Sequence, residues 1–498
     1  MDKDQQIDQL TSINKQQFAQ IAQLRFELGE MKRLLFGSKS ERFVPVSSMD
    51  TAQLDLAGMM QQLATTPPAV EEVVVIKKKL TDHKPTGRLP IPDHLERVNI
   101  YLEPQQDVTG YRKVTEECTE QLDYVPGKLI VRRYIRPKYA RDSADGTTTE
   151  FIIAPLPDFA IERGMAAAGL LAQIIVDKHV DHLPIDRQIK RYQRHGVKLA
   201  ASTICGWLEA TAKLIEPMAG ELKKQVFSSG YLQADETPLP VLNGETKGAA
   251  HTGYLWAYHS PPLQLIYYDY QPGRSKKGPL GLLNNFSGYL QTDGYGVYDH
   301  AAIGGRADIT QLHCMAHARR YFEKALPTDK APAEYFLTEL QKLYAIERRL
   351  REQQYSKEQI VEIRQFEALP ILAALKTWLT EQYTTNLIKS PITTAVNYAL
   401  ARWDKLSVYT TDSQLQIDNN LVENAMRPVA LGRKNYLFAG SNEGGKRLAL
   451  FYSLLESCKK HQINPLDYMR NILERMPVTK TSELRSLLPD QWKPIPVK

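Results

Sequence analysis

Short runs of apolar and aromatic residues, separated by glycine, proline and polar residues, predict a set of β-strands in the middle of the chain. The five runs that fit best occupy residues 231–235, 254–259, 263–270, 289–293 and 308–312. A shorter run at 278–284 has helical spacing and precedes the fourth predicted strand. The pattern therefore predicts an α/β domain built around a mixed sheet, which we place at 226–460.

The order of these elements narrows the fold class. Three strands in a meander, followed by a helix and a fourth strand, are the order of the ribonuclease H-like fold. From about 325 to 410 the apolar spacing becomes helical, with Leu337, Leu340 and Leu343 on one face. We therefore expect a helical insertion within the sheet domain, and a helical tail over 461–498.

Heptad spacing predicts a coiled-coil zipper over residues 1–45. One seam recurs every seven residues, at Ile7, Asn14, Ile21, Leu28 and Leu35. A polar residue such as Asn14 at this position fixes register and strand number at a cost in stability. The alternative is one amphipathic helix packed on its own domain. The glutamine-rich outer face favours self-association, so we expect a homodimer or a higher assembly.

Residues 46–87 have the composition of a linker, and the strand-like pattern of 88–160 predicts a separate small module. A strip within it, 128–141, carries six basic residues and no acidic one. Interleaved tyrosines such as Tyr134 suit stacking beside phosphate contacts. The DNA-binding candidates in this strip are Arg132, Arg133 and Arg136. A solvated strand face explains the same pattern equally well.

The stretch 161–225 predicts helices arranged as a helix-turn-helix. A basic helix over 183–194 is broken at His195 and Gly196, and Ser202 can cap the helix that follows. The residues of the basic helix that would contact DNA are Arg187, Lys190, Arg191 and Arg194. Many helical hairpins have this outline without binding DNA.

Composition excludes several classes of protein. The formal net charge is only +6, so any nucleic-acid surface must come from local patches. The 4 cysteines form no Cys-x-x-Cys pair, which argues against a disulfide framework and a thiolate zinc site. No apolar run reaches the roughly 18 residues that a membrane span needs, and no secretory signal is recognisable. We expect a cytoplasmic protein without a membrane partner.

Three acidic residues stand in matching contexts. Asp235 and Asp293 each follow an apolar strand beside a turn, and Glu423 lies in the first turn of a helix that Asp418 or the neighbouring asparagines can cap. An isolated aspartate in such a place is usually a turn or cap residue. Three of them together fit the ligands of two Mg²⁺ ions about 3.5–4 Å apart, which serve phosphodiester chemistry.

Basic residues surround the third acid. Arg427 lies four positions after Glu423 on the same helix face, as a salt-bridge partner or a phosphate clamp. Arg433, Lys434 and Asn435 follow Gly432 and suit contacts with the DNA backbone. A solvated basic loop is the alternative.

The stretch 313–320 holds Cys314 and His317 three positions apart. A zinc site would need two more ligands, so we predict no zinc there. His317 is a candidate for catalytic support by hydrogen bonding near the acids, and Arg319 and Arg320 are candidates for DNA contact.

Several motifs resemble one known family, the transposases of the insertion sequence 66 family. The motifs that carry the resemblance are LLFGSKSER at 34–42, EQLDYVP at 120–126, QADETP at 233–238, QTDGYGVYD at 291–299, HCMAHARRYF at 313–322 and IDNNLVENAMRPVALGRKNYLFAGS at 417–441. They span nearly the whole chain, and the last is highly specific.

The resemblance implies a DDE-type transposase with a ribonuclease H-like catalytic domain. It implies that Asp235, Asp293 and Glu423 are the catalytic residues and bind two Mg²⁺ ions, for which Mn²⁺ can substitute. It implies that the chain acts on DNA in bacteria, at the nucleoid when bound, by recognising transposon ends, cleaving them and joining the 3′-hydroxyls to target DNA. Accessory transposition proteins would be further partners.

One departure from the family pattern concerns the module at 88–160. The family normally carries cysteine pairs there as a zinc finger, but this chain has Thr109–Lys113 and Ala140–Ala144 in those places, without cysteine. The module is therefore degenerate, with no zinc ligands. This leaves an alternative function, a catalytically silent, dimeric protein that binds DNA ends. A repair nuclease of the same fold would have no need for the zipper.

Overall fold

The computed structural model describes residues 127, 129–135, 138–142, 149–153, 155–162, 164–242, 249–300, 303, 305–385 and 390–494. The predicted zipper and linker, Arg136 and most of the 88–160 module lie outside the described residues. The chain divides into two compact units, one of residues 1–46 with 138–498 and one of 47–137. In the second unit, 129–135 is exposed extended chain that includes Arg132 and Arg133.

A five-stranded mixed sheet lies at the centre of the first unit. Its strands are β3 (Tyr231–Leu242), β4 (Ala250–Ser260), β5 (Leu265–Gln271), β6 (Gly288–Thr292) and β7 (Ile309–His313). Their order across the sheet is β5-β4-β3-β6-β7. The first three strands form an antiparallel meander, whereas β6 is parallel to β3 and β7 is parallel to β6. The α/β class is confirmed, and helix α6 (Lys277–Leu283) precedes β6 as expected.

Strand β3 is longer than its sequence predicts. The predicted strand covers 231–235, but β3 continues through Pro238 to Leu242 and pairs with β4 from Gln233 onward. The amide of Leu242 donates to Ala439 O, and Ala439 N donates to Pro240 O. The backbone N–H and C=O groups of the even-numbered residues in this part of β3 therefore point away from β4. The prolines at 238 and 240 would have directed their N–H groups to this side, where β6 does not extend. The missing N–H groups therefore cost no hydrogen bond to a neighbouring strand.

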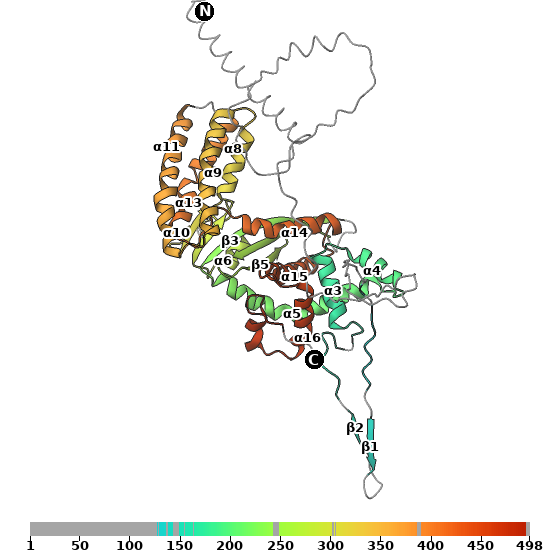
Figure 1. Ribbon diagram of the computed structural model, residues 1–498. Helices are drawn as coiled ribbons and strands as arrows, with labels where there is room; N and C mark the ends of the chain where they lie inside the picture. The colour runs from blue at the N-terminus through green and yellow to red at the C-terminus, as the bar shows by residue number, and fades with distance from the viewer. Residues whose placement is uncertain are drawn as a thin grey trace, which may run out of the picture. The chain divides into compact units, whose positions relative to one another are not determined.

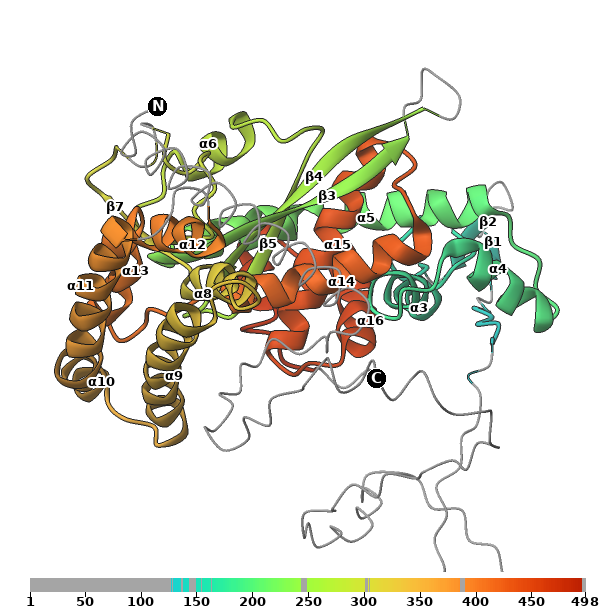
Figure 2. The same cartoon turned by 90° about the horizontal axis from the view of Figure 1, so that it is seen from above.

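Helices cover both faces of the sheet (Figures 1 and 2). The long helix α5 (Ala201–Phe227) joins α3 (Ala168–His179) and α16 (Pro465–Arg475) in a core with Leu232 and Ala234 of β3. Helices α14 (Asn420–Tyr436) and α15 (Asn442–Lys460) pack against Leu239 and Val241, whose side chains leave β3 on the other face. Asp235 has the same parity as Leu239, so it belongs to the α14 face.

A helical group between β7 and α14 has its own core. Its members are α8 (Met315–Ala325), α9 (Lys330–Glu352), α10 (Lys357–Ile363), a π-helical turn (Arg364–Ala368), α11 (Leu369–Thr385), α12 (Pro391–Leu400) and α13 (Trp403–Ser407). Buried Arg364 pairs with Glu347 at 2.7 Å and also donates to the carbonyls of Tyr409, Asp412 and Leu415. It thereby fixes the chain that returns toward α14.

The predicted helix pair is α4 (Ile185–Arg194) followed by α5. The expected cap was wrong: α5 begins at Ala201, and its N-cap Ala200 makes no side-chain bond, which puts Ser202 inside the first turn. Strands β1 (Lys138–Asp142) and β2 (Thr149–Ile153) form an antiparallel pair. In the part of the chain that the structure describes, no helix is long and apolar enough to cross a bilayer.

Candidate active site

Sheet register brings the two aspartates together. Strands β3 and β6 run parallel, with Gln233 opposite Gln291. Asp235 and Asp293 each lie two positions beyond these glutamines and are therefore neighbours across the two strands. Asp293 directly follows β6 as predicted, but Asp235 lies inside β3, which continues to Leu242. The backbone fixes each carboxylate further, because Asp235 accepts a bond from Glu236 N at 2.9 Å and Asp293 accepts one from Tyr295 N at 2.8 Å.

A buried network behind the aspartates joins the two strands to the chain before α14. Gln291 accepts from the hydroxyl of Tyr231 at 2.6 Å and from the amide of Gln233 at 2.8 Å. Gln233 also donates to Asp418 O at 3.0 Å, and Gln291 donates to Gln416 O at 2.8 Å. The network therefore sets the position of the helix start relative to the strand ends.

Glu423 enters the site from the first turn of α14. Asn419 is the N-cap and its carbonyl accepts from the amide of Glu423, but its side chain makes no cap bond. Asp418 instead accepts from Asn420 N at 3.1 Å and from the hydroxyl of Tyr344 on α9 at 2.9 Å. The predicted cap is thus partly realised through Asp418, which the helical group holds in place.

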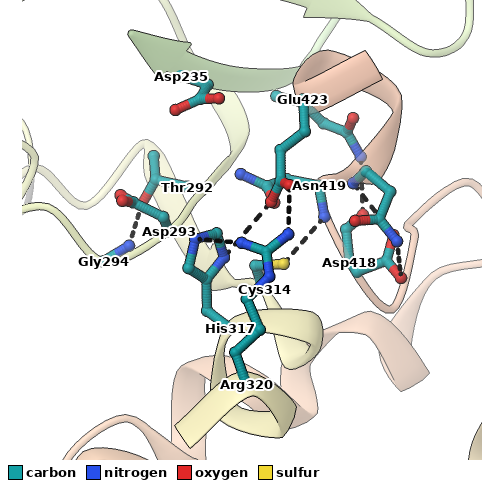
Figure 3. A network of polar contacts seen from close by, with 12 residues as sticks. Asp235, Thr292, Asp293, Gly294, Cys314, His317, Arg320, Asp418, Asn419 and Glu423 are labelled. Carbon is teal, nitrogen blue, oxygen red and sulfur yellow. Dashed lines mark hydrogen bonds and ion pairs between the residues drawn. The ribbon is translucent and has the colours of Figure 1, made fainter. Parts of the chain in front are cut away.

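The three carboxylates face a common space between the sheet, α14 and α8 (Figure 3). Burial, followed by the negative charges of Glu236, Asp293 and Glu423, raises the pKa of Asp235 to about 8. Glu423 Oε1 is buried, and none of the residues that the structure describes lies close enough in the right geometry to donate a hydrogen bond to it. A cluster of oxygen ligands that repel each other fits hard divalent cations, because bound cations would remove the repulsion.

Two residues of α8 contact Glu423. Arg320 donates to Glu423 Oε2 at 2.6 Å, and His317 Nδ1 lies 3.5 Å from Glu423 Oε1. Burial lowers the pKa of His317, so its ring stays neutral. With Arg320 donating to His317 Nε2 at 3.1 Å, the ring proton belongs on Nδ1, toward the carboxylate. His317 thus lies beside Glu423, and its role as a catalytic support stays a prediction.

The potential ligand atoms of Cys314, His317 and Glu423 lie within 4.8 Å of one another. Cys314 is fully buried, which raises the pKa of its thiol, and its Sγ accepts from Asn419 N. The thiol therefore serves to hold the start of α14 rather than to offer a thiolate.

The basic residues of α14 differ in what they contact. Arg433 donates to Thr237 Oγ1 at 3.1 Å and to Pro238 O, which fastens α14 to β3. Asn435 donates to Leu431 O within the helix. Arg427 and Lys434 are exposed on the surface of α14.

The other residues predicted to contact DNA also fall into two groups, those paired within the protein and those exposed. Arg319 pairs with Glu323 along α8 at 3.3 Å. On α4, Arg191 pairs with buried Asp177 of α3, and Lys190 pairs with Asp186 at 2.8 Å on the surface. The exposed residues of this helix include Arg187 and Arg194.

Several site residues had no role in our reading of the sequence. The buried glutamines Gln233 and Gln291 could have been found, because the same residue type stands two positions before each aspartate. Arg274 could not have been found from the sequence, because its partners are distant along the chain. It pairs with Glu236 on the opposite face of β3 at 2.5 Å, and its guanidinium lies over the ring of Tyr295.

Comparisons with known proteins identify the family of the chain. Residues 163–447 match the family model described as "Transposase IS66 family", residues 453–489 match "IS66 C-terminal element", and residues 23–100 match "Transposase C of IS166 homeodomain". The chain is 30% identical to the uncharacterized protein y4jD of Sinorhizobium fredii over 98% of both chains. It is also 30% identical to the uncharacterized protein y4qI of that organism, over 98% of this chain and 92% of the relative. No solved structure matches.

Proposed function

Because the chain belongs to the IS66 family of transposases, we propose that it is a DNA transposase that binds the ends of an insertion sequence. It cleaves phosphodiester bonds at these ends with two Mg²⁺ ions and joins the freed 3′-hydroxyls to target DNA. The strand order β5-β4-β3-β6-β7, with a meander followed by parallel strands, supports a ribonuclease H-like catalytic domain.

The convergence of Asp235, Asp293 and Glu423 is the observation that carries the proposal (Figure 3). Divalent cations held there would activate an attacking oxygen and neutralise charge at the scissile phosphate. The oxygen ligands suit Mg²⁺, with Mn²⁺ as a substitute. The chain itself supplies position, since the glutamine network fixes both strand ends against α14.

Arg320 and His317 complete the site from α8. In the cation-free state Arg320 neutralises Glu423. Glu423 would be a ligand of a bound divalent cation, and the guanidinium of Arg320 beside it would then be placed to donate to a phosphate oxygen. His317 orients both partners through its neutral ring. Arg427, exposed one turn beyond Glu423, contacts the DNA backbone.

DNA ends are bound through the exposed basic residues of α4, with Arg132 and Arg133 of the small module as further contacts. The zipper makes the chain a homodimer, which pairs two ends. Accessory proteins of the element are further partners.

A second candidate is a catalytically silent protein that binds ends as a dimer. The observation that favours it is the missing cysteine pairs at 109–113 and 140–144. The three carboxylates and their supporting network favour the active enzyme.

The test is cleavage of a supercoiled plasmid that carries the terminal repeats flanking the gene, with Mg²⁺ and with Asp293→Asn as the inactive control. The proposal expects nicks at the repeats that disappear in the variant. Binding to the repeats without any nick, in Mg²⁺ or Mn²⁺, would replace it with the silent alternative.

A further inference from the structure

Helix α14 presents one exposed stripe along its length. Its buried residues, among them Val422 and Val429, face the sheet. The exposed residues recur at helical spacing on the other side, at Asn424, Arg427, Leu431 and Lys434. The stripe begins beside Glu423, so a ligand that follows it leads into the carboxylate site.

The stripe ends in two exposed apolar side chains. Leu437 is 62% exposed and Phe438 is 44% exposed, directly after α14. Leu437 has φ of 66° and ψ of −44°, the strained backbone of a γ-turn with positive φ, which is rare for leucine. We call this turn the α14 tip (437–438). Its strained backbone and its exposed apolar side chains together indicate a binding surface.

The α14 tip is held rigidly. Leu437 N donates to Arg433 O at 2.9 Å, and Phe438 N donates to Tyr436 O at 2.8 Å. The next residue, Ala439, exchanges two backbone bonds with β3, through Pro240 O and Leu242 N, each at 2.9 Å. These bonds fix the backbone of the tip, so the tip cannot move toward the core without breaking the bonds between Ala439 and β3.

The surroundings indicate a nucleic acid as the partner. Exposed Lys434 lies one turn before the tip, and Arg427 lies further along the same stripe. The C-terminal half of α14 also reaches the connection between α3 and α4, where a Cβ on Gly432 would lie 3.2 Å from His182 Nδ1. In Figure 1 this end of α14 points toward α3 and α4. The tip thus lies between the exposed basic face of α4 and the carboxylates.

We propose that Leu437 and Phe438 form a wedge that enters the stacked bases of the bound DNA end while Arg427 and Lys434 contact its backbone. The inference rests on the proposed transposase function. Apolar side chains flanked by basic ones are the usual means by which proteins unstack and kink a duplex. Because the backbone of the wedge is already fixed, the wedge loses little conformational entropy when it enters the DNA.

The position of the distortion follows from the helix. Glu423 and Tyr436 are separated by 13 residues, which at about 1.5 Å per residue is about 20 Å. At about 3.4 Å per base pair, the unstacked step lies roughly six base pairs from the cleaved phosphate.

The first test scans 2-aminopurine through a duplex of the terminal repeat and measures its fluorescence, which rises when a base unstacks. We expect the wild-type chain to raise it several-fold near the sixth base pair, and Leu437→Gly with Phe438→Ala to abolish the rise while the duplex stays bound. Glycine accepts the positive φ that Leu437 has in this turn, so the variant keeps the fold. Phe366→Ala, at a phenylalanine that is 84% exposed elsewhere, is the matched control.

The second test measures nicking. The double variant should nick a fully paired end at least tenfold more slowly than wild type, and recover on a duplex with mismatches near the sixth base pair. Equal nicking of both duplexes, or an unchanged fluorescence rise, would overturn the wedge while the transposase proposal stands. Loss of chain self-association in sedimentation with unchanged fluorescence would assign the tip to a second copy instead. If wild type nicks neither duplex, the proposed function itself fails.

Discussion

The two halves of the carboxylate site are held by different means. Asp235 and Asp293 take their places from the register of neighbouring strands, which needs only local sequence and one parallel pairing. Glu423 takes its place from contacts across long sequence separations, through Asp418, Tyr344 and the chain fixed by Arg364. The sheet half is therefore robust, whereas the helix half depends on the helical group between β7 and α14.

Breaking the buried Arg364–Glu347 pair should have the largest effect on stability. Arg364→Ala leaves Glu347 buried without its partner and frees three carbonyls, so the free energy of unfolding should fall by about 3–5 kcal/mol. Urea unfolding measures it. Replacing both residues, as Arg364→Met with Glu347→Leu, should restore part of the loss, and an equal loss in the double variant would contradict a pairing effect.

The next effect is on the rate of cleavage. Gln291→Leu removes the acceptor shared by Tyr231 and Gln233 and releases the chain at Gln416. A displacement of about 1 Å at the reacting groups slows nicking on the order of 100-fold, with DNA affinity unchanged. Single-turnover nicking and a gel shift separate the two quantities. Gln414→Ala, at an exposed glutamine nearby, should leave both unchanged.

The electrostatics of the sheet half can be tested by pH. The pKa of Asp235 is about 8 in the fold and ordinarily 3.8. Between these values the unfolded chain loses a proton that the folded chain retains, so stability falls as pH rises from about 4 to 8. With metal chelated, Asp235→Asn should flatten this fall in Tm between pH 5.5 and 8. A slope identical to that of wild type would contradict a pKa of Asp235 raised by its burial among the other carboxylates.

The smallest effects distinguish two adjacent basic residues. Arg433→Ala should lower the free energy of unfolding by about 1 kcal/mol, because the bonds to Thr237 and Pro238 fasten α14 to β3. Lys434→Ala should leave stability unchanged. It should reduce the slope of log K for DNA binding against log salt concentration by about 1, since one phosphate contact is lost. Reversed results would exchange the structural and DNA-binding roles.

The same contrast explains what the sequence could predict. The strands, their order along the chain and Asp293 directly after β6 follow from patterns of a few residues, and so does Glu423 in a first helical turn. Asp235 was singled out too, but it lies inside β3 rather than at its end. The longer β3 was missed because proline usually ends a strand, whereas the missing N–H groups of Pro238 and Pro240 lie on the side of β3 that neither β4 nor β6 pairs with. The pairing of Glu423 with Arg320, rather than with Arg427 four residues away, depends on α8 lying against α14. The use of Arg191 and Arg433 as internal fasteners likewise becomes visible only in three dimensions.

The most direct test of the central claim is strand transfer from a pre-cleaved, labelled terminal-repeat duplex into a supercoiled plasmid. The wild-type chain with Mg²⁺ should join the 3′-hydroxyl of the duplex to the plasmid. Asp235→Asn, Asp293→Asn and Glu423→Gln should each bind the duplex and yield no joined product. Joined product of normal yield from any of the three variants would contradict the assignment of these carboxylates as the catalytic site.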